Sequence, residues 1–136
     1  MTNLARGFSM RSVEDFIAAA GRSGKFSEID TVEAVANPRV VDIHLEHSAG
    51  HEFIVMVRED RGEARILFED YLFDAVPVHR VLEFLDLIAS CEVVLALNRS
   101  GRLLSLTVSL PEGDWIDRRT YANDFSEWER SVGERG

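Results

Sequence analysis

Residues 41–68, VDIHLEHSAGHEFIVMVREDRGEARILF, decide the fold because they can be arranged as two successive antiparallel hairpins that share a middle strand. With Ser48-Ala49-Gly50 as the first loop, the residues that face each other on one side are all apolar: Leu45 and Phe53, Ile43 and Val55, Val41 and Val57. A second loop over 59–62 presents the same face to the next strand, through the pairs Phe53 and Phe68, Val55 and Ile66, Val57 and Ala64. We therefore expect a three-stranded meander, over residues 39–47, 52–58 and 63–70, that buries one face.

The segments before and after this meander have apolar residues at helical spacing. Ser12 is the predicted N-cap of a short helix that ends at Gly21 or Gly24, and residues 22–38 are assigned to a connector. Pro77 opens the widest apolar stripe, which continues to Ala89 and predicts a helix across the sheet.

The C-terminal third of the chain predicts one more hairpin and one more helix. Residues 93–97 and 104–108 are the two strands, 99–102 their loop, and 111–113 the end of the sheet. A docked helix is expected from about residue 120 to 132, on the spacing of its large apolar residues: Tyr121, Phe125, Trp128 and Val132.

The predicted order is therefore α-β-β-β-α-β-β-α, a single α+β domain with helices packed on an antiparallel sheet. We expect this domain to cover residues 12–132, with a flexible N-terminal lead over 1–11 and a tail over 133–136. The order resembles that of the type III secretion chaperone-like superfamily, which includes the YbjN-like bacterial proteins, and the resemblance covers Ser12 to Val132. It implies a non-enzymatic module that dimerises and binds protein partners, and it supplies no catalytic residue.

Composition and charge exclude several classes of partner. The chain has 136 residues, a single cysteine and no apolar run near the ~20 residues of a membrane span, which favours a cytoplasmic protein that does not bind membranes. Residues 30–136 carry eleven basic and twenty-one acidic residues, a net charge of −10. Such a body repels nucleic acid and favours a cationic protein partner.

No residue pattern predicts catalysis, a metal or a cofactor. Strand alternation places Asp42, His44 and Glu46 on one face and His47 and His51 on the other, so no metal site is expected. The rings of the second pair are expected to pack against the end of the hairpin; in the alternative, two adjacent imidazoles make that end sensitive to pH. Cys91 is expected in the core, and no phosphate-binding loop or nucleophile motif is present, so we expect no enzyme activity.

The second face of the meander is the predicted protein interface. Ile54, Met56 and Leu67 are apolar where a solvated face should be polar, and Arg58 and Arg65 belong to their charged rim. Trp128 is added as a large aromatic side chain suited to partner contact. In the alternative, the C-terminal helix covers this face through Phe125 and Trp128.

Three functions remain open. The first is a homodimeric protein-binding module, such as a secretion-chaperone-like, adaptor or regulatory protein. The second is a bacterial toxin-immunity protein that blocks a cationic toxin with its acidic surface. The third is a small ligand- or metal-binding protein that uses the His44 region.

Overall fold

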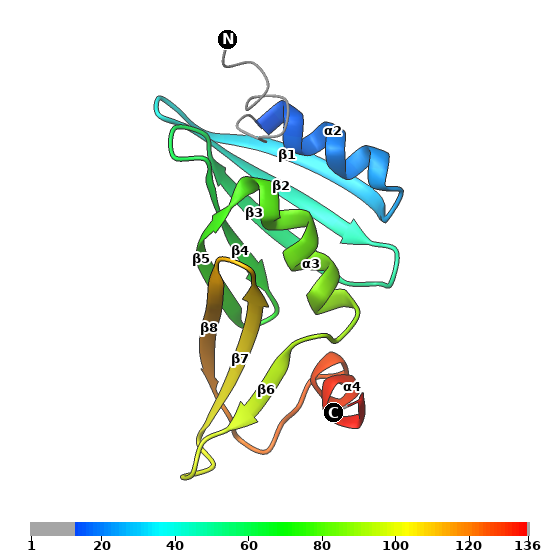
Figure 1. The fold of residues 1–136 in the computed structure, drawn as a ribbon, viewed down its shortest axis with the longest axis vertical. Helices are drawn as coiled ribbons and strands as arrows, with labels where there is room; N and C mark the ends of the chain where they lie inside the picture. Colours follow the sequence, from blue (N-terminus) through cyan, green and yellow to red (C-terminus); the bar gives the residue numbers. More distant parts are fainter. Residues whose placement is uncertain (1–12, 136) are drawn as a thin grey trace.

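The two hairpins of residues 41–68 form the centre of a five-stranded antiparallel sheet (Figure 1). The structure is a computed structural model and describes residues 13–135. The strands follow chain order: β1 (Phe26–Ala36), β2 (Arg39–His47), β3 (Glu52–Arg58), β4 (Glu63–Phe68) and β5 (Tyr71–Pro77). The predicted register is confirmed, with Ile43 opposite Val55 and Val55 opposite Ile66. All three of these side chains are fully buried.

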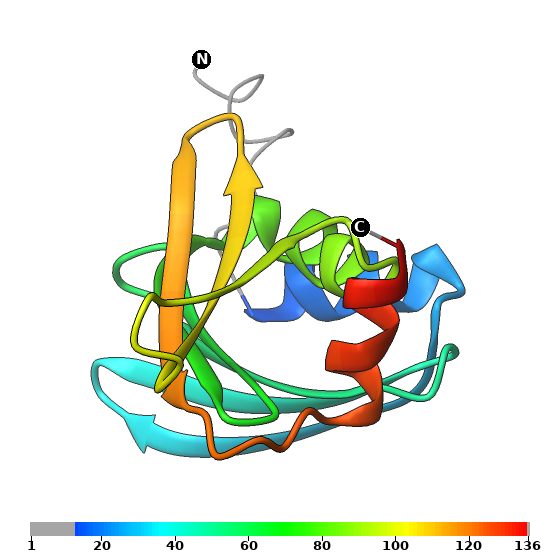
Figure 2. The ribbon, with the colours of Figure 1, turned by 90° about the horizontal axis from the view of Figure 1, so that it is seen from below.

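The helices of the described residues lie together on the apolar face of this sheet, as Figure 2 shows. They are α2 (Val13–Ser23), the short 3-10 turn η1 (Val78–Arg80) with α3 (Val81–Ala89), and α4 (Glu127–Arg135). Phe16, Phe84 and Trp128 are their largest contributions to the common core. No helix within residues 13–135 is long and apolar enough to span a membrane.

A second, three-stranded sheet closes the other end of the core. It contains β6 (Val94–Leu97), β7 (Leu103–Leu110) and β8 (Gly113–Thr120), in that order. The predicted pairing of Leu95 with Leu106 and of Leu97 with Leu104 is confirmed. Two hydrogen bonds connect β8 to β5: the Trp115 indole N–H donates to the Asp74 carbonyl over 2.9 Å, and the Leu72 N–H donates to the Asp117 carboxylate over 2.7 Å. The α+β class is thus confirmed, but with two sheets.

Three strands escaped the sequence prediction. β1 occupies the expected connector, because as an edge strand it leaves Val32 and Val35 exposed and so shows no apolar alternation. β5 has an irregular register, and Ala75 at φ 57° interrupts its alternation. β8 follows the expected sheet end at 111–113. It escaped because its alternation is the reverse of the usual one: the apolar Ile116 is exposed, whereas the charged Arg119 faces inward.

The ends of the helices also differ from expectation. Gly24, at φ 67°, follows the last residue of α2, but the predicted Ser12 cap and the lead over 1–11 lie outside the described residues. α4 begins seven residues later than expected and continues through Gly133, which was assigned to the tail. Tyr121 and Phe125 pack ring against ring, 4.8 Å apart, in the loop before it.

The two faces of β4 should differ in their contribution to stability. Ile66→Ala removes a fully buried side chain, so we expect the free energy of unfolding to fall by about 2–5 kcal/mol. Leu67→Ala, on the half-buried outer face, should cost roughly half as much, because less apolar area returns to water. Urea denaturation of both variants measures the difference, and equal costs would contradict the assigned faces.

Candidate functional site

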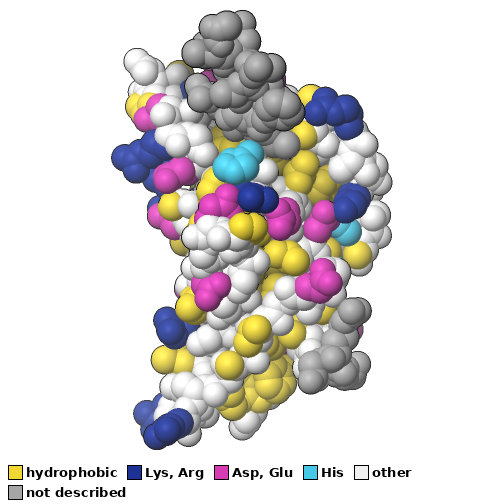
Figure 3. Space-filling view, viewed as in Figure 1, with side chains coloured by type: hydrophobic (Ala, Val, Ile, Leu, Met, Phe, Trp, Pro, Cys, Tyr) yellow, Lys and Arg dark blue, Asp and Glu magenta, His cyan; other side chains and the backbone are white. Residues whose placement is uncertain are grey.

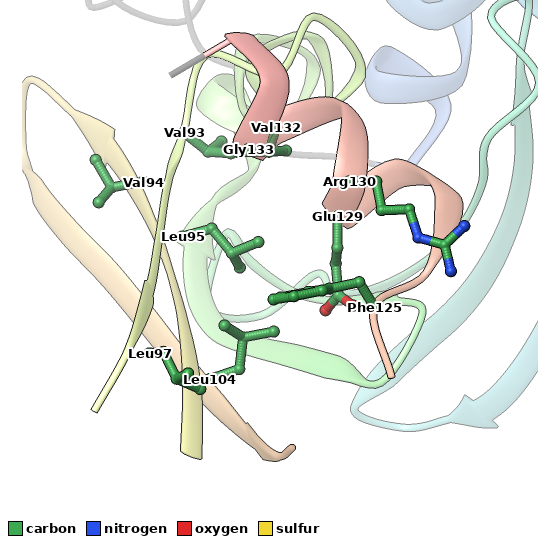
Figure 4. A pocket seen from close by; sticks show the side chains of 10 residues that line it. All are labelled: Val93, Val94, Leu95, Leu97, Leu104, Phe125, Glu129, Arg130, Val132 and Gly133. Atoms are coloured by element: carbon green, nitrogen blue, oxygen red, sulfur yellow. The ribbon is translucent and has the colours of Figure 1, made fainter. Parts of the chain in front are cut away.

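An apolar groove lies between the second sheet and α4. Its volume is about 750 Å³, and hydrophobic side chains gather at this part of the surface in Figure 3. Figure 4 shows Leu95, Leu104 and Phe125 pointing into the same space, whereas Val94 and Arg130 point away from it. The apolar side chains that line the groove come from β6, β7 and α4 with their flanking residues: Val93, Leu95, Leu97, Leu104, Phe125 and Val132.

The groove is open because its two walls diverge. At one end Val93 lies against Val132 and Gly133, while toward the β6–β7 turn the strand and the helix separate (Figure 4). Leu97 and Phe125 stand at this wider end and remain 46% and 38% exposed. Apolar side chains that converge on an open cleft are typical of a binding site.

A buried carboxylate forms the inner wall of the groove. Glu129 is 1% exposed and accepts hydrogen bonds from three other residues. Tyr71 donates its hydroxyl over 2.5 Å, and Arg119 donates in a bidentate manner, from Nε over 2.8 Å and from Nη2 over 2.6 Å. The Ser126 N–H donates over 2.8 Å. The network therefore connects β5, β8 and α4.

The network also contains the N-terminal cap of α4. The Glu129 N–H donates to the Ser126 hydroxyl oxygen over 3.1 Å, while the Glu129 carboxylate accepts the Ser126 N–H. This reciprocal pair is a capping box, which fixes where the helix begins. The Ser126 hydroxyl donates in turn to the Glu69 carboxylate over 2.8 Å.

The network favours the charged forms of Glu129 and Arg119 and the neutral form of Tyr71. Burial alone would raise the pKa of Glu129, but hydrogen bonds from Arg119 and Tyr71 outweigh it, and the pKa lies below its usual value. The hydrogen bond to Glu129 raises the pKa of Arg119. Burial, then the hydrogen bond to Glu129, raises the pKa of the Tyr71 hydroxyl. Because these groups already bind each other, none is poised to exchange a proton with a ligand.

The predicted interface residues lie on the outer face of the first sheet, opposite the helices. Ile54, Met56 and Leu67 are half-buried side chains of β3 and β4. Arg58 and Arg65 both bind Asp74, over 2.8 and 3.3 Å, so they are neutralised within the chain.

Trp128 lies elsewhere than expected. It is buried on the helix side of the sheet, where its indole N–H donates to the Ile88 carbonyl over 2.9 Å and its ring contacts Phe68. α4 therefore does not cover the outer face, and Trp128 does not belong to it.

The histidines divide between the two faces of their strands, as predicted. His44 is exposed on the outer face, while His47 is buried, accepts the Ala49 N–H at Nδ1 and contacts Phe26 edge-to-face. Burial, followed by the nearby His47, lowers the pKa of His51. Within residues 13–135, no group of three or more His, Cys, Asp or Glu side chains is placed to hold a metal. Cys91 is half-buried against the core at the end of α3.

An acidic hollow surrounds His44. Its volume is about 280 Å³, and Ile54 and Leu67 line it together with five carboxylates: Glu28, Asp30, Glu46, Glu52 and Glu69. Among the described side chains, none of these five forms an ion pair, although the Ser27 and Ser126 hydroxyls donate to Glu46 and Glu69.

Comparison with known proteins adds no further assignment: no family model, curated protein or solved structure matches this chain. The sequence prediction missed the groove because its walls come from separate elements, β6, β7 and α4. One local signal was available. Ser126 and Glu129 have the Ser-x-x-Glu spacing of a capping box and mark the true start of α4.

Replacing the buried carboxylate tests the network. Glu129→Gln removes the two short hydrogen bonds between the buried Arg119 and a carboxylate and leaves it only the exposed Asp124, 3.5 Å away, as a counter-ion, so we expect the free energy of unfolding at pH 7 to fall by about 3 kcal/mol. Since the pKa of Glu129 is lowered by folding, its contribution is complete above about pH 4.3 and is lost as the pH falls through the folded-state pKa. The difference between variant and wild type should therefore shrink on acidification.

Urea denaturation at several pH values measures this effect. Glu127→Gln, two residues earlier on an exposed position of the same helix, is the matched control and should change stability by no more than about 0.5 kcal/mol. A cost of Glu129→Gln that stays constant with pH would contradict an ionised Glu129.

Proposed function

We propose that this protein is a non-enzymatic protein-binding module of a bacterial cytoplasm, and that the groove between the second sheet and α4 is its docking site. Its role is that of an adaptor, regulatory or secretion-chaperone-like protein. The observation that carries the proposal is the groove itself, an open cleft of about 750 Å³ that leaves Leu97 and Phe125 in contact with water. Exposed apolar surface of this kind marks interaction sites.

The chemistry of the groove supports binding over catalysis. Its one buried carboxylate, Glu129, is occupied by Arg119, Tyr71 and Ser126. The remaining walls are chiefly aliphatic and aromatic, so a bound segment gains free energy by burying apolar area, at about 25 cal/mol per Å².

A charged side chain in the groove should weaken binding of the partner. With Leu97→Asp, a bound apolar segment would desolvate a carboxylate without a partner, so we expect at least about a tenfold loss of affinity. The matched control is Ile116→Asp, which places the same charge at a 49% exposed position on β8, outside the groove lining. Capture of partners from the native host, followed by titration of the purified partner, measures the effect.

The acidic hollow supports a second candidate function, a toxin-immunity protein. The five carboxylates around His44, none of them in an ion pair, would attract a cationic segment of a toxin. Ile54 and Leu67, which also line the hollow, would contact an apolar residue of that segment. If the captured partner is cationic, keeps its affinity for Leu97→Asp and loses it on Glu46→Lys, the immunity function replaces the groove proposal.

We further propose that the protein forms a homodimer through the outer face. Ile54 on β3, Leu67 on β4 and the 41% exposed Leu72 on β5 form an apolar row across three strands. No described helix covers this row (Figure 2).

A charge at the centre of this row should separate the dimer. We expect Leu67→Glu to lower the mass in sedimentation without unfolding, and Arg61→Glu, at the exposed β3–β4 turn, to leave the mass unchanged. Because dimerisation brings two acidic hollows together, it should strengthen as salt rises. A wild-type monomer at high concentration and high salt would contradict the dimer.

A further inference from the structure

β6 is an edge strand whose free side faces the groove. The Asn98 N–H donates to the Leu103 carbonyl over 2.9 Å, and this bond sets the alternation of the ladder. Val94 and Ala96 therefore bond to their β7 partners Thr107 and Ser105, while the N–H and C=O groups of Leu95 and Leu97 point away from β7.

The free side of β6 lacks three of the features that protect an edge, and its shortness is the one it has. Its four residues, Val94–Leu97, include no charge and no proline, and its pairing with β7 has no bulge. β1, an edge strand of the other sheet, has 11 residues and two of these three features: Glu28, Asp30 and Glu33 lie along it, and two register shifts interrupt it. The contrast within one molecule indicates that β6 is an edge open to pairing.

The groove supplies what an added strand needs besides backbone bonds. Residues that pair directly across an antiparallel ladder have side chains on the same face. Partners of Leu95 and Leu97 would therefore direct their side chains into the groove, against Leu104, Phe125 and Val132. Backbone bonds to an edge combined with pockets for alternate side chains define strand addition as a mode of peptide recognition.

Charge around the groove specifies the partner further. Arg130 borders the groove, and Arg99 and Arg102 belong to the turn that follows β6. No ion pair joins these three arginines to any other described side chain, although the whole chain carries a net charge of −9. A second copy of β6 would bring its own turn arginines to this groove, whereas acidic residues in a partner would be attracted.

We propose that an extended segment of an acidic partner protein adds to β6 as the fourth strand of the second sheet, with alternate apolar side chains in the groove and acidic residues beside the three arginines. This inference rests on the groove being the docking site. It specifies the recognition mode: backbone pairing with Leu95 and Leu97.

Synthetic peptides test the backbone pairing without altering the protein. The probe has two glutamates at each end and a centre of alternating valine and threonine, so that the valines enter the groove opposite Leu95 and Leu97. N-methylation of the valines removes the N–H groups that would donate to β6, and the loss of about two hydrogen bonds should weaken binding about tenfold or more. N-methylation of the threonines, whose N–H groups face away from β6, should change affinity by less than about threefold.

A pair of protein variants gives the complementary test. Leu97→Pro removes a free N–H of the edge while the ladder to β7 stays intact, because proline is tolerated at edge positions that do not donate. The affinity of Leu97→Pro for the unmodified peptide should be about tenfold lower than that of Leu97→Val, which keeps the N–H. Replacing the glutamates of the peptide by lysines should weaken binding to both proteins. Fluorescence anisotropy measures affinity, and circular dichroism confirms the fold.

The outcomes separate this inference from the proposed function. If valine- and threonine-methylated peptides bind equally, or no peptide binds, strand addition is wrong. If Leu97→Asp nevertheless loses the cellular partner, the groove remains the docking site. If the partner keeps its affinity for Leu97→Asp, both proposals fail together.

Discussion

The arrangement of the second half of the molecule depends on the burial of one carboxylate, Glu129. An ionised carboxylate in a protein interior is tolerated only with close counter-charges and hydrogen bonds. Those bonds come from Tyr71 at the start of β5, Arg119 near the end of β8 and Ser126 at the cap of α4. All three elements must therefore meet at one point, which fixes the second sheet and α4 relative to the first sheet.

The groove is a consequence of this attachment. The capping box fixes the start of α4 beside Glu129, while toward the other end of the helix Val132 lies against Val93, the residue before β6 (Figure 4). Between these two contacts the helix axis and the strand diverge, and no described side chain fills the space (Figure 4). The groove is thus an apolar cleft beside a polar network that fixes the start of α4. Such a preformed cleft avoids part of the ordering cost of binding.

Sequence reasoning was accurate where burial imposes alternation and inaccurate where it does not. The β2–β4 meander was predictable because every second residue, from Val41 to Phe68, enters one core. β1 escaped because it is exposed on nearly every residue, and β8 because its inward position 119 holds an arginine whose main partner, Glu129, lies ten residues away on α4. The groove could not be read locally, since its walls are 20 or more residues apart in the chain.

Charge is distributed so that the two candidate surfaces select opposite partners. Carboxylates without an ion-pair partner surround His44 on the outer face of the first sheet, while the turn after β6 carries Arg99 and Arg102, which form no ion pair with a described side chain. With a screening length of about 8 Å at physiological salt, each surface acts on an approaching segment largely independently of the other. An acidic segment is therefore repelled by the outer face and concentrated at the groove, where the unprotected edge of β6 is available for pairing. Charge selects the surface, and backbone geometry then selects the extended conformation.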